Sequence, residues 1–88
     1  MKNENIIKNV YFIGLGDRVG QFIVMIDYNI SDKAYSVLTL PELECLYINE
    51  DEIYKNIMEK KIDFVETLPD TVFNDCKNQF LLKETINN

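Results

Sequence analysis

The chain has 88 residues, of which 47% are hydrophobic, and its nine basic and fifteen acidic side chains give a formal net charge of −6. These values are typical of a folded soluble domain with one small core. No apolar run approaches the roughly 18 residues that a membrane-spanning helix needs, and the polar start of the chain has no signal-peptide pattern. We therefore expect a single cytoplasmic domain over residues 1–88.

The charge pattern argues against direct binding to nucleic acids or membranes. A nucleic-acid surface needs a basic stripe, and the only adjacent basic residues here are Lys60 and Lys61. Anionic membranes are disfavoured for the same electrostatic reason. The expected partner is therefore another protein, with a basic surface as one possibility.

The residue usage bears on compartment and origin. Cys45 and Cys76 lie 31 residues apart without a C-x-x-C pattern, which favours reduced thiols over a disulfide framework. Asn, Ile and Lys supply 29 of the 88 residues, while Arg occurs once. AT-rich codons encode the first three types, so the composition indicates an AT-rich bacterium or its phage.

The first half of the chain predicts strands. Residues 8–15 and 21–28 are rich in β-branched and aromatic side chains, and the turn-forming residues after 28 separate them from an alternating segment at 34–40. Pro41 ends that segment, and residues 44–48 fit a short fourth strand. The first two strands predict a β-hairpin.

From residue 49 the hydrophobic period changes from two to about 3.6, which predicts helices. Asn49 is a suitable N-cap for the first helix. Residues 62–65 fit a short fifth strand, and Asp70 is expected to cap a second helix that buries Phe73 and Phe80.

The predicted fold class is α+β. We expect a small antiparallel sheet of four to five strands, beginning with a β-hairpin, with two helices packed on one face, in the order β-β-β-β-α-(β)-α. Ten side chains are predicted to form the core: Phe12, Phe22, Val24, Ile26, Val37, Leu46, Ile53, Ile57, Phe73 and Phe80.

The segment YFIGLGDRVGQF contains the most motif-like pattern in the chain, a glycine-rich loop at residues 14–20. A dinucleotide fingerprint has the spacing G-x-G-x-x-G, but here Val19 occupies the third glycine position. A strand-like segment follows the loop, where a phosphate cradle needs a helix. A hairpin connection is the favoured interpretation, and a ligand cradle is the alternative.

Arg18 is the single arginine and lies in this loop. It is either a solvated turn residue or an anchor for a carboxylate or phosphate. The second possibility supports an alternative function, the binding of a small anion or nucleotide by Arg18 and the loop from Gly14 to Gly20.

Catalytic and metal-binding patterns are absent from the sequence. Without histidine, the chain lacks the commonest general base and the usual transition-metal ligand. The acidic run at residues 50–52 does not have the order of a calcium loop and fits the start of a helix better. We expect a protein without enzymatic activity, cofactor or metal.

The leading functional hypothesis is a small acidic protein-binding module, acting as an inhibitor, regulator or immunity-type factor. A self-associating structural subunit is a further alternative. Acids held on ordered elements, neighbouring tyrosines and the loop arginine are the candidate partner-binding residues: Glu50, Asp51, Glu52, Glu42, Glu44, Tyr47, Tyr54 and Arg18.

Overall fold

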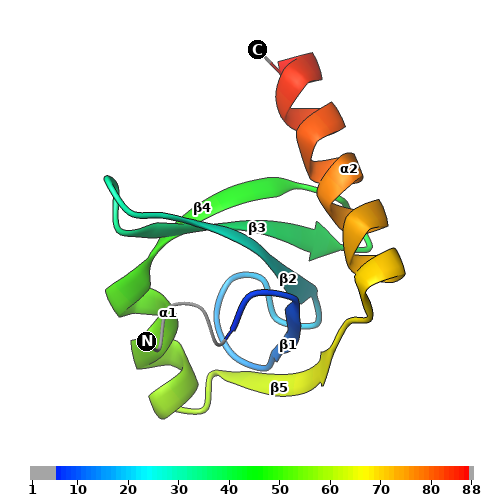
Figure 1. The fold of residues 1–88 in the computed structure, drawn as a ribbon. Coiled ribbons are helices and arrows are strands. Elements are labelled where there is room, and N and C mark those ends of the chain that lie inside the picture. The colour runs from blue at the N-terminus through cyan, green and yellow to red at the C-terminus, as the bar shows by residue number, and fades with distance from the viewer. Residues whose placement is uncertain (1–5, 88) are drawn as a thin grey trace.

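The computed structural model describes residues 6–87, with side chains described as far as Thr85. It contains one five-stranded antiparallel sheet and two helices (Figure 1). The predicted α+β class and element order are confirmed, and the fifth strand is present. In chain order the elements are β1 (Asn9–Ile13), β2 (Phe22–Asn29), β3 (Ala34–Leu40), β4 (Cys45–Asn49), α1 (Glu50–Met58), β5 (Ile62–Thr67) and α2 (Asp70–Asn87).

The sheet has the strand order β4-β3-β2-β1-β5. Strands β1 to β4 therefore form a meander, and β5 returns to pair with β1 on the far side. Val24 in the central strand β2 lies opposite Val10 on β1 and Leu38 on β3. The sheet curls strongly, and β4 and β5 are its two edges (Figure 1).

Helix α1 covers one face of the sheet, which we call the α1 face. Because β4 and β5 are at opposite edges, the connection between them has to cross the sheet, and α1 lies on that crossing. Ile53 of α1 is 1% exposed. It packs with side chains from the three central strands, among them Tyr11, Ile23, Met25, Tyr35 and Val37.

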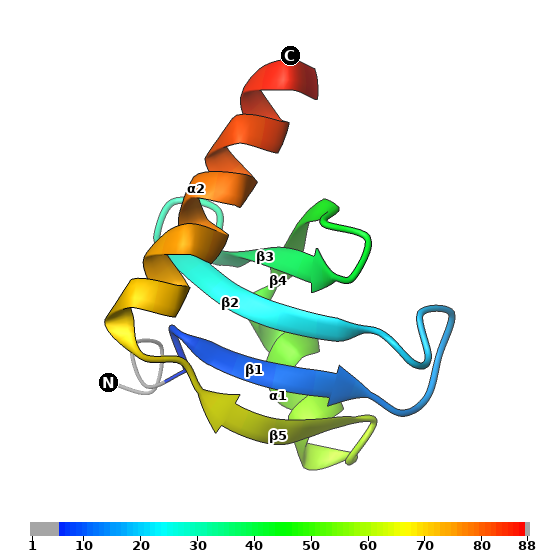
Figure 2. The same cartoon turned by 90° about the vertical axis from the view of Figure 1, so that its right-hand side faces the viewer.

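Helix α2 covers the opposite face, the α2 face (Figure 2). Its Phe73 and Phe80 pack against Val10, Val24, Ile26 and Leu38. The prediction that both helices pack on one face is therefore wrong. The reason is that β2 is apolar on both sides: four consecutive side chains, residues 23–26, are buried. Both faces of such a strand need a covering layer.

The α2 face is only partly covered. Figure 2 shows α2 crossing one end of the sheet and then extending beyond it. Phe12 and Phe22 lie at the other end, where β1 runs into the loop and β2 leaves it. Phe22 is 36% exposed, and Phe12 is half-buried and outside both core clusters, so the prediction that both belong to the core is wrong. Their rings contact each other, with centroids 5.2 Å apart.

The two helix starts differ. The Asn49 side chain accepts a hydrogen bond from the Asp51 amide at 2.8 Å, which confirms Asn49 as the cap of α1. Asp70 is the first residue of α2, and the first helical carbonyl acceptor is that of Pro69. The expected capping role of Asp70 is therefore wrong. Its carboxylate instead pairs with Lys8, and this bond lowers the pKa of Asp70.

Candidate functional site

The glycine loop is a hairpin connection, as the sequence favours. Gly16 and Gly20 have φ angles of 109° and 94°, a region that residues with a Cβ rarely adopt. The Gly20 amide donates to the Ile13 carbonyl at 2.8 Å and closes the loop. The Gly14 amide donates to the Lys61 carbonyl at 2.9 Å, which ties the loop to the start of β5. Strand β2 follows directly, so no helix N-terminus is available for a phosphate.

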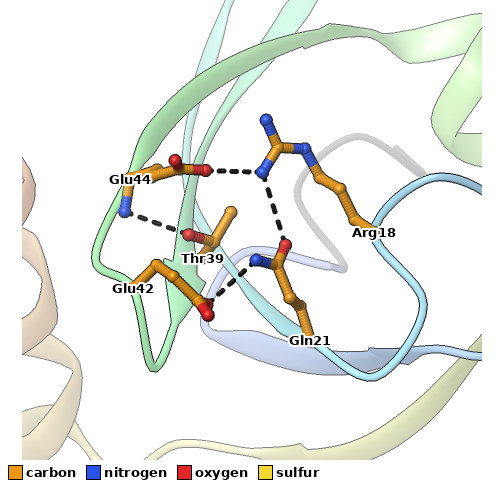
Figure 3. Close-up of polar contacts among 5 residues, drawn as sticks. All are labelled: Arg18, Gln21, Thr39, Glu42 and Glu44. Carbon is orange, nitrogen blue, oxygen red and sulfur yellow. Dashed lines mark hydrogen bonds and ion pairs between the residues drawn. The ribbon is translucent and has the colours of Figure 1, made fainter.

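Arg18 ties this loop to the turn between β3 and β4 (Figure 3). Its Nη1 atom donates to the Glu44 carboxylate and, at 3.4 Å, to the Gln21 side chain. Gln21 in turn donates to Glu42 at 2.9 Å. The buried Thr39 hydroxyl accepts from the Glu44 amide at 3.0 Å and fixes the turn from beneath. The structure thus brings Arg18, Glu42 and Glu44 together.

Glu42 and Glu44, two of the candidate partner-binding acids, are both exposed. In the structure both bond to side chains of the β1–β2 loop. The Arg18–Glu44 pair is 40% and 50% exposed, and such pairs contribute little to stability. The negative charge of Glu44 is offset locally by the one arginine of the chain.

The acids of α1 form a separate group at the other end of β4. Glu44 precedes this strand and Glu50 follows it, a separation of roughly 20 Å for extended chain. Glu50 accepts a hydrogen bond from the Tyr28 hydroxyl at 2.6 Å, and this bond is the main reason that the pKa of Tyr28 is raised to about 12. Asp51 and Glu52 are exposed. The five predicted acids therefore do not form one cluster.

The two candidate tyrosines have different surroundings. Tyr47 is 58% exposed, and one edge of its ring contacts Phe80 with centroids 5.9 Å apart. Tyr54 is half-buried, and its hydroxyl lies 2.7 Å from that of Tyr35. Burial, reinforced by this hydrogen bond, raises the pKa of Tyr35. Tyr54 therefore belongs to the packing of the α1 face, whereas Tyr47 can contact a partner.

A cavity of about 430 Å³ lies between the β1–β2 loop, β4, α1 and the start of β5. Arg18, Tyr47 and Glu52, three of the predicted residues, line it together. Its apolar wall comes from elements far apart in the sequence. Only the curl of the sheet brings them together, so no local pattern in the sequence could have indicated the cavity.

The outer edge of β5 is a feature that the sequence interpretation missed. Five of its six residues are exposed, including Phe64 at 57% and Val65 at 45%. Among the residues that the structure describes, β5 pairs only with β1, so backbone groups on its other side have no neighbouring strand there (Figure 2). The mainly apolar residues 62–65 indicate a strand, but its position at the edge follows from the strand order of the sheet, which the local sequence does not encode.

The thiols have the environment of packing residues. Burial raises the pKa of both Cys45 and Cys76, which keeps them protonated and weakly nucleophilic. The Cys45 thiol donates to the Phe80 carbonyl at 3.4 Å. Both side chains lie against the core of the α2 face.

Within residues 6–87, no group of three or more Cys, Asp or Glu side chains is arranged to hold a metal ion. Neither helix in this part of the chain is long and apolar enough to cross a membrane. Comparison of the chain with protein families, characterised proteins and solved structures gave no match. The function is therefore inferred from the geometry alone.

Proposed function

We propose that this chain is a non-catalytic, cytoplasmic protein-binding module whose partner adds a strand to the open edge of β5. The observation that supports the proposal is the exposure of this edge, with Phe64 and Val65 accessible between Asp63 and Glu66. Strand addition uses backbone hydrogen bonds for affinity and alternate side chains for specificity. An inhibitor, a regulator or an immunity-type factor can act in this way.

The charges on β5 favour a basic partner over a second copy of the chain. Ile62–Thr67 contains two acids and no base. If two β5 strands paired about their centre, Asp63 of each would lie opposite Glu66 of the other, and like charges in that position destabilise a sheet. An extended segment in which Lys or Arg alternates with apolar residues would meet complementary charge instead.

A bulge in β5 supports the same preference. The register of β5 against β1 shifts between Val10 and Tyr11, where one extra residue is accommodated. Bulges and acids are common protections of edge strands against identical copies. They leave the edge open to a partner strand that offsets the negative charge.

The test uses a short peptide that alternates lysine and valine, with a glutamate–valine peptide as the control. In amide NMR spectra, the basic peptide should shift the signals of β5 and slow their hydrogen exchange, while the acidic peptide should have no effect. Binding should weaken at high salt, because dissolved ions screen the attraction between exposed opposite charges.

The matched variants remove two charges in different places. The double variant Asp63→Asn/Glu66→Gln should bind the basic peptide several-fold more weakly. The control double variant Asp32→Asn/Asp75→Asn removes one acid from the β2–β3 turn and one from α2, and it should bind the peptide with unchanged affinity. Shifts centred on β4, or equal weakening in both double variants, would refute strand addition at β5. A concentration-dependent dimer with protected β5 amides would assign the edge to a second copy.

A further inference from the structure

The cavity beside the β1–β2 loop has the size of a small-molecule site and combines an apolar wall with a charged rim. Its volume of about 430 Å³ falls within the range of roughly 300–1,000 Å³ that ligand pockets occupy. One wall is apolar and is built mainly from isoleucines of β1, β2, β4, α1 and β5: Ile13, Ile23, Ile48, Ile53 and Ile62. Ile13, Ile23, Ile53 and Ile62 are buried and Ile48 is half-buried, so the wall is the surface of the core and Ile48 is its most accessible part.

The rim of the cavity carries both signs of charge. Arg18 and Lys61 line it, as do Asp17 and Glu52, so the rim itself is formally neutral on a protein of net charge −6, and Glu44 pairs with Arg18 beside it. The single arginine therefore lies where the negative field of the protein is partly offset. A ligand that places its charge next to Arg18 and away from Glu52 would gain the most.

Arg18 has hydrogen-bonding capacity left over. The guanidinium has five N–H donors, and both bonds to Glu44 and Gln21 leave from Nη1 (Figure 3). Its Nε and Nη2 atoms have no hydrogen-bond partner among the described residues. These two atoms present parallel donors, the geometry that fits a carboxylate. Glu44 already holds the guanidinium, which reduces the ordering cost of binding.

A second cavity on the other side of the loop lacks this combination. It has a volume of about 530 Å³ and is also lined by Arg18, but Val19 and Pro41 are its only apolar side chains. An apolar body would find no wall there. Of these two cavities, the isoleucine-walled one is therefore better suited to an amphipathic ligand.

We propose that the isoleucine-walled cavity binds a small carboxylic acid with an apolar body, whose carboxylate is held by the free donors of Arg18 and whose hydrocarbon lies against the isoleucine wall. The binding is non-covalent and independent of strand addition at β5. It would give the chain a ligand-binding role beside its proposed partner.

The experiment uses octanoate as the probe and isoleucine δ-methyl NMR as the readout. Titration to about 10 mM, a range suited to a ligand of this size, should give saturable shifts at the five wall isoleucines. Ile26, buried on the α2 face, and Ile30, 79% exposed in the β2–β3 turn, are internal controls and should not move. Octanol and octylammonium should bind at least several-fold more weakly than octanoate.

Four variants separate the charge from the wall. Arg18→Gln should lower the affinity for octanoate about tenfold. Lys77→Gln, on the exposed surface of α2, also removes one positive charge and should leave the affinity unchanged. Glu52→Gln should tighten octanoate binding by removing a repelling charge. Ile48→Phe should fill part of the cavity and abolish the shifts while the spectrum stays that of the folded protein.

Three results would overturn the proposal: no saturable shift at the wall isoleucines, equal shifts at Ile30, or octylammonium binding as tightly as octanoate. Unchanged affinity in the Arg18→Gln variant would also refute the role of the arginine. These outcomes do not depend on whether a peptide binds at β5.

Discussion

The two faces of the sheet are covered in different ways. On the α1 face, the curl of the sheet, the short helix α1 and the β1–β2 loop enclose one continuous cluster that includes Tyr35 and Ile53. On the α2 face, an 18-residue helix covers one end of the strands and then leaves the sheet (Figure 2). The length of a helix thus does not determine how much of a sheet face it covers, because the path of the chain between strands decides where the helix lies.

The largest expected effect compares covered and uncovered phenylalanines on the α2 face. Phe80→Ala should lower the free energy of unfolding by about 3–5 kcal/mol, because the ring is 3% exposed and the helix anchors there. Phe22→Ala on the uncovered end should cost only about 1–2 kcal/mol, since 36% of that residue is already exposed.

Urea unfolding measures both values, with Leu82→Ala as a control. Leu82 is 56% exposed on the part of α2 that extends from the sheet, so its replacement should change the stability by no more than about 0.5 kcal/mol. Equal losses for Phe22 and Phe80 would mean that the whole α2 face is covered in solution. A small loss for Phe80 would mean that α2 is detached.

The next effect concerns the tyrosines of the α1 face at alkaline pH. The Glu50 bond and burial raise the pKa of Tyr28 from 10.0 to about 12, and burial raises that of the neighbouring Tyr35. The folded state therefore holds these protons more tightly than the unfolded state. The stabilising contribution of Tyr28 is complete below pH 10 and is lost as the pH rises from 10 towards 12, and that of Tyr35 begins to fall at the same pH.

Denaturant midpoints measured across this pH range should fall steeply in the parent protein. Glu50→Gln removes the charge that raises the pKa of Tyr28, so the fall should be shallower. The exposed Tyr47 provides the control, because Tyr47→Phe should keep the parent slope. If Glu50→Gln left the slope unchanged, the Tyr28–Glu50 bond would not exist in solution.

The sequence predicts most of the strands and helices, but not which face of the sheet each helix covers. The strands, the cap at Asn49 and the hairpin at the glycines follow from local patterns such as alternation and turn chemistry. The unbroken apolar residues 23–26 indicate that both faces of the sheet are covered, so they already favour helices on opposite faces rather than both helices on one face. The cavity and the pairing of Arg18 with Glu44 join segments far apart in the chain. No periodicity encodes such contacts.

A smaller effect tests how firmly α1 is fixed over its face. Asn49→Ala should cost about 1 kcal/mol, because the Asp51 amide would lose its side-chain acceptor. Asn78 lies exposed in the middle of α2, so Asn78→Ala should be neutral or slightly stabilising, since alanine has the higher helix propensity. Thermal unfolding of the two variants and the parent protein measures both changes in stability. Equal losses would show that Asn49 does not cap α1.

The smallest expected effect concerns the ion pair that ties the loop beside the α1 face to the β3–β4 turn. A double-mutant cycle of Arg18→Gln and Glu44→Gln should give a coupling free energy of about 0–1 kcal/mol, because both side chains are substantially exposed. The coupling should shrink at high salt, where exposed charges are screened. A coupling well above this range would mean that the pair is shielded from water in solution. The β1–β2 loop would then be a fixed wall of the cavity, held by Glu44 as firmly as the isoleucines are held by the core.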